Sequence, residues 1–333
     1  MARALRIWGL LAAAALVALG VALASGSTLL GWRELPALLL RPDGGAASEV
    51  LHTLRLPRAM AAFATGGLLA VAGALMQVLL RNPLADPYVL GLSGGAAAGA
   101  LAAMWLGGGA LLMHLGAFGG ALLTIVLVFG FAHRELASLS AAGTQDHAPR
   151  LLLTGVMLAA GWTALVTLML SLAPEARLRG MLFWLAGDLS GAEGGLGPLL
   201  ALGLLLALTA PLARDLNVLL RGPAAAQALG VPVVRVRRLL FALASVAAAV
   251  AVTTSGSVGF IGLVVPHALR LLVGNDQRVL LPACALGGGT LLLLADTLAR
   301  TVVAPQQLPV GVITAMLGVP TFLVLLRRSG VPR

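Results

Sequence analysis

The chain has 333 residues, of which 59% are apolar and only 10% are Asp, Glu, Lys or Arg, whereas soluble domains carry about 25% charged residues. This composition excludes a soluble enzyme or binding module, because too little polar surface is available. The absence of a glycine repeat excludes a collagen-like chain, and the abundance of Leu, Val and Ala excludes a disordered one. The net charge is +10, but the basic residues are scattered between apolar segments, which favours a polytopic membrane protein over a nucleic-acid-binding one.

The sequence also limits the chemistry of the chain. All 22 basic residues are Arg, so there is no P-loop signature, which requires a Lys on the nucleotide phosphates. Any ATP that drives this protein must therefore be bound by another chain. The single cysteine, Cys284, provides neither a disulfide nor a cysteine metal cluster. We expect no resident cofactor or metal.

The apolar segments predict an all-α fold with ten transmembrane helices. A bilayer core about 30 Å thick requires about 20 apolar residues per helix. Ten segments approach that length: 7–30, 60–80, 89–107, 110–132, 150–172, 195–213, 238–256, 258–273, 279–299 and 308–326. The third is rich in glycine and the eighth is short and contains Pro266, so both need neighbouring helices to satisfy their backbone. The first could be a cleaved signal peptide, but its length favours an uncleaved helix.

The arginines predict the orientation of these helices, because cytoplasmic loops carry an excess of basic residues. With ten spans and a cytoplasmic N-terminus, 15 arginines lie inside and 7 outside. We therefore expect both termini in the cytoplasm. The outer arginines are Arg33, Arg41, Arg55, Arg58, Arg177, Arg179 and Arg300. The long connections are then 31–59 and 173–194 outside, the latter with residues 181–185 at the interface, and 133–149 and 214–237 inside.

The inner connection contains a predicted short helix. Pro223 suits the first turn of a helix, the alanines that follow favour helix, and Gly230 fits a C-terminal stop. A helix of about two turns is marginal in water by itself, so we expect it to be held by packing or by a partner. An ordinary ordered loop helix is the alternative.

The outer pair Arg55 and Arg58 is unusual. Pro57 marks a helix start, so Arg55 precedes this helix and Arg58 lies in its first turn. Cations at a helix N-terminus oppose the helix dipole, and basic residues on the outer side oppose the positive-inside rule. An acidic partner from outside would explain both arginines. On the residues alone, two solvated loop arginines are the simpler interpretation.

The predicted spans are nearly free of charge. Asp188 and Asp296 lie near span ends, whereas an ion-coupled secondary transporter needs an ionisable group or a broken polar helix in mid-membrane. A membrane enzyme would need a clustered nucleophile or metal set, which we do not find. His267 is the histidine with the most suggestive setting, and a helix-terminal His bonded to backbone is favoured over a ligand.

Two blocks of longer motifs can be recognised along the chain. The first block is Leu54-Arg55-Leu56-Pro57-Arg58, Gly73-Ala74-Leu75-Met76-Gln77, Arg81-Asn82-Pro83-Leu84-Ala85-Asp86-Pro87 and Leu90-Gly91. The second is Ala228-Leu229-Gly230-Val231, Gly259-Phe260-Ile261-Gly262-Leu263-Val264-Val265-Pro266-His267, Arg270, Gly274-Asn275-Asp276, Asp296-Thr297-Leu298-Ala299-Arg300 and Leu308-Pro309-Val310-Gly311-Val312. These motifs resemble those of the FecCD-type permeases, the membrane subunits of ABC importers for iron–siderophores, haem and cobalamin. The resemblance covers almost the whole chain in the family's order.

The resemblance implies a single permease domain over residues 1–333, with ten helices and cytoplasmic termini, in the bacterial inner membrane. It implies a homodimer with the pathway between subunits, two cytoplasmic ATPase subunits and a periplasmic binding protein. A large metal chelate would cross by alternating access, driven by ATP. Iron–siderophore, haem and cobalamin all stay open as cargo. The alternative is an ion-coupled secondary transporter of a small solute.

The resemblance also implies which residues contact the partners. The coupling helix that sits in the ATPase groove corresponds to Arg221, Gly222, Gln227, Leu229, Gly230 and Val231. The family often has acidic residues after this glycine, whereas Pro223 and Ala224 follow it here, so a less polar contact is expected. The arginines that pair with glutamates of the binding protein correspond to Arg55, Arg58 and Arg300, and planar guanidinium groups suit carboxylates.

Overall fold

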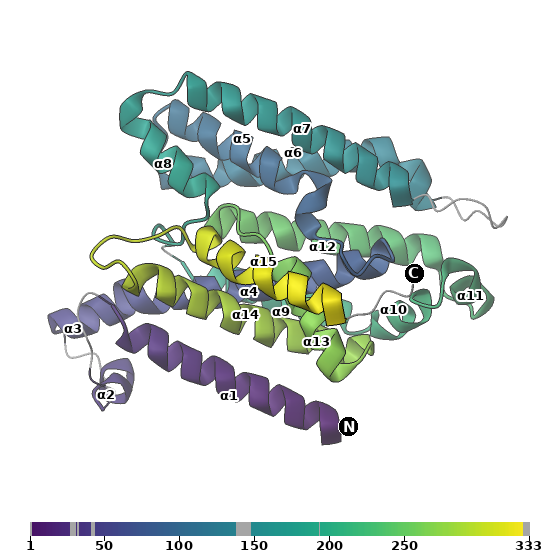
Figure 1. The fold of residues 1–333 in the computed structure, drawn as a ribbon, viewed down its shortest axis with the longest axis horizontal. Coiled ribbons are helices and arrows are strands. Elements are labelled where there is room, and N and C mark those ends of the chain that lie inside the picture. Colours follow the sequence, from purple (N-terminus) through teal and green to yellow (C-terminus); the bar gives the residue numbers. More distant parts are fainter. Residues whose placement is uncertain are drawn as a thin grey trace.

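The computed structural model describes residues 2–26, 31, 33–40, 44–137, 148–192 and 194–328. Its elements are helices arranged in an elongated bundle (Figure 1). In chain order they are α1 (Ala2–Ala24), α2 (Leu35–Leu40), α3 (Ala46–Glu49), the π-helix η1 (Val50–Arg55), α4 (Leu56–Leu79), the 3-10 helix η2 (Pro87–Leu90), α5 (Leu92–Trp105), α6 (Ala110–Ala137), α7 (Ala148–Ser171), α8 (Glu175–Leu185), α9 (Leu196–Thr209), α10 (Ala213–Leu219), α11 (Pro223–Ala228), α12 (Val233–Ser255), α13 (Ile261–Val273), α14 (Gln277–Thr301) and α15 (Val310–Arg328).

The all-helical membrane fold is confirmed. Among the described residues, six helices are long and apolar enough to cross a membrane, and α9 with α10, bent by 65°, would add a seventh. The shorter helices α5, α13 and α15 are also apolar. Each of the ten segments predicted from the sequence overlaps one of these helices. The first helix ends at Ala24 rather than near residue 30, and residues 27–30 lie outside the described part of the chain.

Helix α4 forms the centre of the bundle. It packs against α14, α12, α9 and α13, and nearly every side chain from Ala61 to Leu79 is buried. Small residues make this packing possible, because a Cβ atom at Gly66 would overlap the carbonyl oxygen of Gly288, and one at Gly73 would overlap that of Gly262. Such close backbone contact is the main way in which helices pack in lipid.

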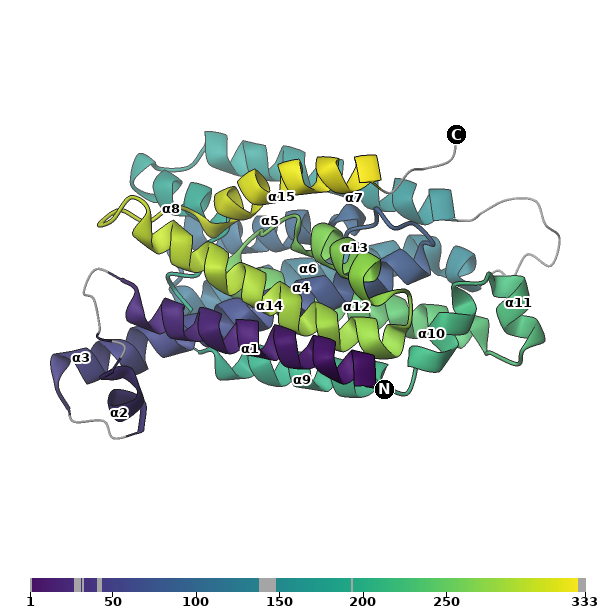
Figure 2. The same ribbon diagram turned by 60° about the horizontal axis from the view of Figure 1, so that its bottom comes forward.

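The helices α5, α6, α7 and α8 form a second group, seen at the top of Figure 1. Helices α5 and α6 touch through two glycine pairs, Gly95 with Gly120 and Gly99 with Gly116, where Cβ atoms would overlap backbone oxygens. Helix α12 joins this group to the rest, since it contacts both α4 and α6. Figure 2 shows α12 running through the middle of the molecule.

The predicted helix start at Pro57 is only partly correct. The helix is continuous from Ala46 to Leu79, and Pro57 lies in the first turn of α4 directly after the π-helical turn η1. Proline has no N–H to donate to the carbonyl four residues earlier. In a π-turn a carbonyl accepts instead from the N–H five residues later, so the carbonyl four residues before Pro57 does not need the N–H that proline lacks. Arg55 therefore lies inside a long helix and not in a loop before one.

The predicted helix end at His267 is wrong. His267 lies inside α13, with its ring 6.5 Å from that of Phe322 on α15. Residues 181–185, which we expect at the membrane interface, form the end of α8, where Met181 and Trp184 are buried in a cluster with α5. The predicted inner loop 133–149 begins as part of α6, and residues 138–147 lie outside the described residues.

Candidate functional site

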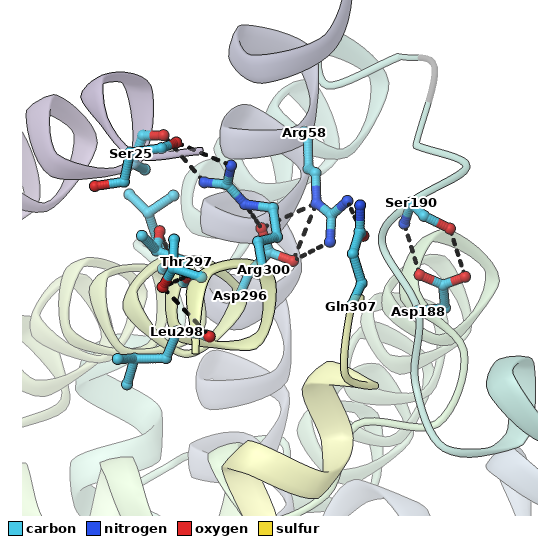
Figure 3. A network of polar contacts seen from close by, with 12 residues as sticks. Ser25, Arg58, Asp188, Ser190, Asp296, Thr297, Leu298, Arg300 and Gln307 are labelled. Carbon is cyan, nitrogen blue, oxygen red and sulfur yellow. Dashed lines mark hydrogen bonds and ion pairs between the residues drawn. The ribbon is translucent and has the colours of Figure 1, made fainter. Parts of the chain in front are cut away.

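A charged cluster occupies the end of the bundle where α4 begins and α14 ends (Figure 3). The Nε atom of Arg58 donates to both carboxylate oxygens of Asp296 at 3.1 Å, and its Nη2 atom donates to Oδ1 at 2.8 Å. The Nε atom of Arg300, one turn after Asp296, lies 3.3 Å from Oδ2. Asp296 is 1% exposed. One buried carboxylate is thus shared by two guanidinium groups, so the cluster keeps a net positive charge.

Each guanidinium group is also held from a second side. Arg58 donates through Nη1 to Oε1 of Gln307 at 2.9 Å. Arg300 donates to the carbonyl oxygens of Ser25 at 3.2 Å and Ala22 at 3.0 Å. The last carbonyls of a helix have no partner within the helix, and a cation near them is favoured by the helix dipole. The end of α1 is therefore fixed to α14 by Arg300.

Arg55, like Arg300, donates hydrogen bonds to carbonyl oxygens at the end of α1. Its Nη1 atom donates to the carbonyl oxygens of Leu23 at 2.7 Å and Ala24 at 3.2 Å, and the residue is only 6% exposed. By contrast, the side chains of Arg58 and Arg300 are 13% and 12% exposed. The structure thus brings together all three arginines that the sequence assigned to docking, but it places Arg55 beneath the surface as a cap for α1.

A cavity of about 650 Å³ lies beside this cluster. It is lined by α8, the end of α5, the start of α6, the end of α12 and the segment before α15. Its lining includes Arg179, Phe183, Trp184, Asp188 and Gln307. The guanidinium of Arg179 lies 5.6 Å from the centre of the Phe183 ring, a cation–π contact. Because Gln307 both lines the cavity and binds Arg58, the charged cluster and the cavity share a wall.

The predicted short helix is present at the other end of the bundle as α11. Gly222, with φ of +113°, precedes it, and Gly230, with φ of +81°, follows it. The N–H of Val231 donates to the carbonyl of Ala226 and that of Gly230 to the carbonyl of Gln227, which together form a Schellman C-cap. The left-handed conformation at Gly230 costs a glycine little, which explains why the sequence signal was reliable here.

The packing of α11 decides which of its residues a partner can reach. Ala226, Gly222 and Val231 are buried, so these positions hold the helix against the bundle. Arg221, Gln227, Leu229 and Gly230 are exposed, and Leu229 has 64% of its surface accessible. Leu229 is therefore a large apolar side chain that α11 exposes outside the bundle.

The neighbouring helix α10 connects this end to α14. The Nδ2 atom of Asn217 donates to Asp276 at 2.7 Å, and the N–H of Gln277 donates to Oδ1 of Asn217 at 2.8 Å. These bonds tie α10 to the start of α14, whose other end carries Asp296 and Arg300.

Sequence reasoning missed two polar links. Asp296 was treated as a span-end residue, although its spacing of four from Arg300 is an ordinary signal of a helical ion pair. In the sequence Gln77 and Arg270 are members of two separate motifs. In the structure Arg270 donates to Oε1 of Gln77 at 2.8 Å and so joins α13 to α4. No local pattern pairs residues that lie 193 positions apart.

The described residues contain no group of three His, Cys, Asp or Glu side chains that could hold a metal ion. A chelate that brings its own coordinated metal would need no such group. The site therefore consists of two surfaces at opposite ends of one bundle, a basic cluster beside a cavity and a capped helix with an exposed leucine.

The chain matches the model of the FecCD transport family over residues 12–328. It is 41% identical over 281 residues to the vitamin B12 import system permease protein BtuC of Escherichia coli O127:H6, covering 83% of each chain. It is 42% identical over 289 residues to the cobalamin import system permease protein BtuC of Halobacterium salinarum, covering 84% of this chain and 74% of that one.

A solved structure agrees with this match. It is assigned to the metal-chelate type of ABC transporter, in an inward-facing conformation, and it superposes with a TM-score of 0.84 at 29% identity, covering 97% of this chain and 99% of that one. On this evidence the chain belongs to the FecCD transport family, as a multi-pass permease subunit of an ABC importer in the cytoplasmic membrane.

Proposed function

We propose that this permease imports a corrinoid of the cobalamin type. The observation that carries the proposal is the identity of 41% and 42% to two permeases, one from Escherichia coli and one from Halobacterium salinarum, that are both named for this cargo. Iron–siderophore and haem are the competing cargoes.

We further propose ten spans with both termini in the cytoplasm, in one domain over residues 1–333. The spans are α1, α4, α5, α6, α7, α9, α12, α13, α14 and α15. The apolar character of these helices supports the count, and the excess of arginines on one side supports the orientation. The charged cluster then faces the periplasm and α11 faces the cytoplasm.

An ABC-importer permease works with ATPase and binding-protein partners. We propose two copies of this chain, two ATPase subunits and one periplasmic binding protein, with the pathway between the copies. Only 11% of the most apolar stretch of α7 is buried within the chain, and Met316 on α15 is 69% exposed. These faces are available to a second copy or to lipid.

We propose that the binding protein docks on Arg58 and Arg300 through acidic side chains. Asp296 holds both guanidinium groups in place and leaves a net positive charge for the partner. Charged pairs of this kind set register and association rate more than affinity. Arg55 supports the same surface from below, because it fixes the end of α1.

We propose that the segment 214–237 couples the permease to the ATPase. Arg221, Gln227, Leu229 and Gly230 would contact the ATPase, while Gly222 and Val231 set the geometry of α11. ATP binding and hydrolysis would move α11, and the link through Asn217 would carry that movement to α14. A bundle with two arrangements would then open alternately to the two sides.

The cargo is tested by ATPase stimulation. The reconstituted complex is mixed with its binding protein loaded in turn with cobalamin, a ferric siderophore or haem. We expect the cobalamin-loaded protein to stimulate hydrolysis most. Equal stimulation by the empty binding protein, or greater stimulation by haem or the siderophore, would contradict the cobalamin assignment while leaving the permease assignment intact. Solute uptake that needs an ion gradient and no ATPase would favour the secondary-transporter alternative.

A further inference from the structure

A groove of about 680 Å³ lies at the cytoplasmic end of the bundle, between α6 and the start of α12. Its lining includes Phe129 of α6, Gln227 of α11, and Arg235, Arg238, Leu239 and Ala242 of α12. The groove therefore adjoins the coupling helix and shares Gln227 with it, whereas Leu229 is not part of its lining.

The rim of this groove is basic. Arg235 and Arg238 are three residues apart on α12, so they lie on one face of the helix, and both are exposed. In the described part of the chain neither makes an ion pair or a side-chain hydrogen bond, and the lining contains no Asp or Glu. Two cations in the first two turns of a helix oppose its dipole, so helix stability does not explain them.

The floor of the groove is apolar and continues toward the middle of the membrane. On α12, Leu239 and Val246 are 40% and 47% exposed. On α6, Val126 and Phe129 are 59% and 39% exposed. The rings of Phe129 and Phe241 lie 6.1 Å apart and hold the two helices together beneath the rim. A charged rim above an apolar trough matches a molecule with an anionic head and a hydrocarbon tail.

We propose that this groove binds an anionic phospholipid of the cytoplasmic leaflet. Its phosphate lies between Arg235 and Arg238, and an acyl chain lies along Leu239, Ala242 and Val246. Basic pockets between transmembrane helices on the cytoplasmic side attract such head groups. The proposal rests on the membrane orientation given above but not on the cargo.

The alternative occupant, an acidic surface of the ATPase, would satisfy the arginines but would leave the trough unused. The apolar floor therefore favours a lipid. Because Gln227 lines the same groove, a bound head group would also stabilise the junction between α11 and α12, where the proposed coupling movement begins.

The test is native mass spectrometry of the isolated permease, without ATPase, in detergent containing phosphatidylglycerol, phosphatidylethanolamine or phosphatidylcholine with identical chains. We expect preferential retention of phosphatidylglycerol. The double variant Arg235→Gln/Arg238→Gln should weaken this retention roughly 25-fold, about fivefold for each arginine near a membrane surface. The matched control Arg6→Gln/Arg278→Gln removes two exposed arginines from the same end and should retain the lipid as the parent does.

A third variant, Ala242→Trp, fills the trough and leaves the charges in place, and it should also displace the lipid. Equal retention of phosphatidylglycerol and phosphatidylcholine, or full retention by the double arginine variant, would overturn the proposal. Binding of millimolar glycerol phosphate at these arginines without retention of phosphatidylglycerol would show a phosphate site without a lipid site and would also overturn it. Normal lipid retention with weaker ATPase binding in the double arginine variant would assign the arginines to the ATPase instead.

Discussion

Arg58 and Asp296 lie 238 positions apart in the chain, yet the Nε atom of Arg58 is 3.1 Å from both carboxylate oxygens of Asp296 (Figure 3). These hydrogen bonds join the start of the central helix α4 to the end of α14 that also carries Arg300. Because Asp296 is buried, its charge needs these partners. The same contact positions two arginines at the surface on which we propose that the binding protein docks.

Replacing Asp296 tests its role as the centre of the cluster. Asp296→Asn should lower the free energy of unfolding by about 3 kcal/mol, because two guanidinium groups would then lie together without a counter-charge. Thermal unfolding of the purified permease measures the effect. Asp188→Asn is the control, since that carboxylate lies at the same end and bonds to the adjacent turn at Ser190. Equal loss of stability in both variants would contradict the role assigned to Asp296.

Reversing a surface charge tests the docking surface. Arg58→Glu should slow association of the binding protein about tenfold and weaken its dependence on salt, since rim charges act mainly on association rate. Surface-binding kinetics at two ionic strengths measure both quantities. Arg33→Glu, at an exposed outer position away from the cluster, should leave the rate unchanged. An unaltered rate in Arg58→Glu would show that docking occurs elsewhere.

Arg55 should behave differently from Arg58. In Arg55→Leu the carbonyls of Leu23 and Ala24 lose their donor, and we expect a cost of about 1–3 kcal/mol. Hydrogen exchange at the end of α1 should become faster, and Arg55→Lys should restore part of the protection. If Arg55→Leu slowed docking and left exchange at α1 unchanged, Arg55 would be a docking residue rather than a helix cap.

The glycine contacts of α4 predict a contrast between two Gly→Ala substitutions. Gly73→Ala should destabilise the permease by about 1–3 kcal/mol, because the new methyl group would overlap the Gly262 carbonyl. Gly119→Ala, on α6, meets no atom within 4 Å and should be neutral or stabilising by up to about 1 kcal/mol, as expected for alanine in a helix. Unfolding midpoints in the same detergent compare them, and equal midpoints would disprove the close packing.

The exposed leucine of α11 should be required for coupling. Leu229→Asp should weaken ATPase association by roughly tenfold, because it replaces an apolar anchor with a charge. Ala224→Asp adds the same charge at another exposed position of the helix and should have a smaller effect. Co-purification of the ATPase subunits, with the fold checked by circular dichroism, measures the difference. Equal loss in both variants would indicate a general charge effect and not an anchor at Leu229.

The sequence predicted features that depend on neighbouring residues. Pro223 and Gly230 located α11 because a helix start and a left-handed C-cap are local properties. The apolar segments located the apolar helices of the bundle, because burial in lipid requires apolar length. The capping of α1 by Arg55 and the hydrogen bonds between Arg58 and Asp296 could not be predicted, because they arise only when helices distant in sequence meet. The π-turn before Pro57 was missed because proline is also compatible with an ordinary helix start.

The most direct test of the whole account is transport. Proteoliposomes that contain the permease with its ATPase are supplied with the binding protein and radiolabelled cobalamin, with and without ATP. We predict ATP-dependent accumulation of cobalamin, which is lost in Leu229→Asp and reduced in Arg58→Glu. A folded complex with active ATPase that accumulates no cobalamin under these conditions would contradict the proposed function.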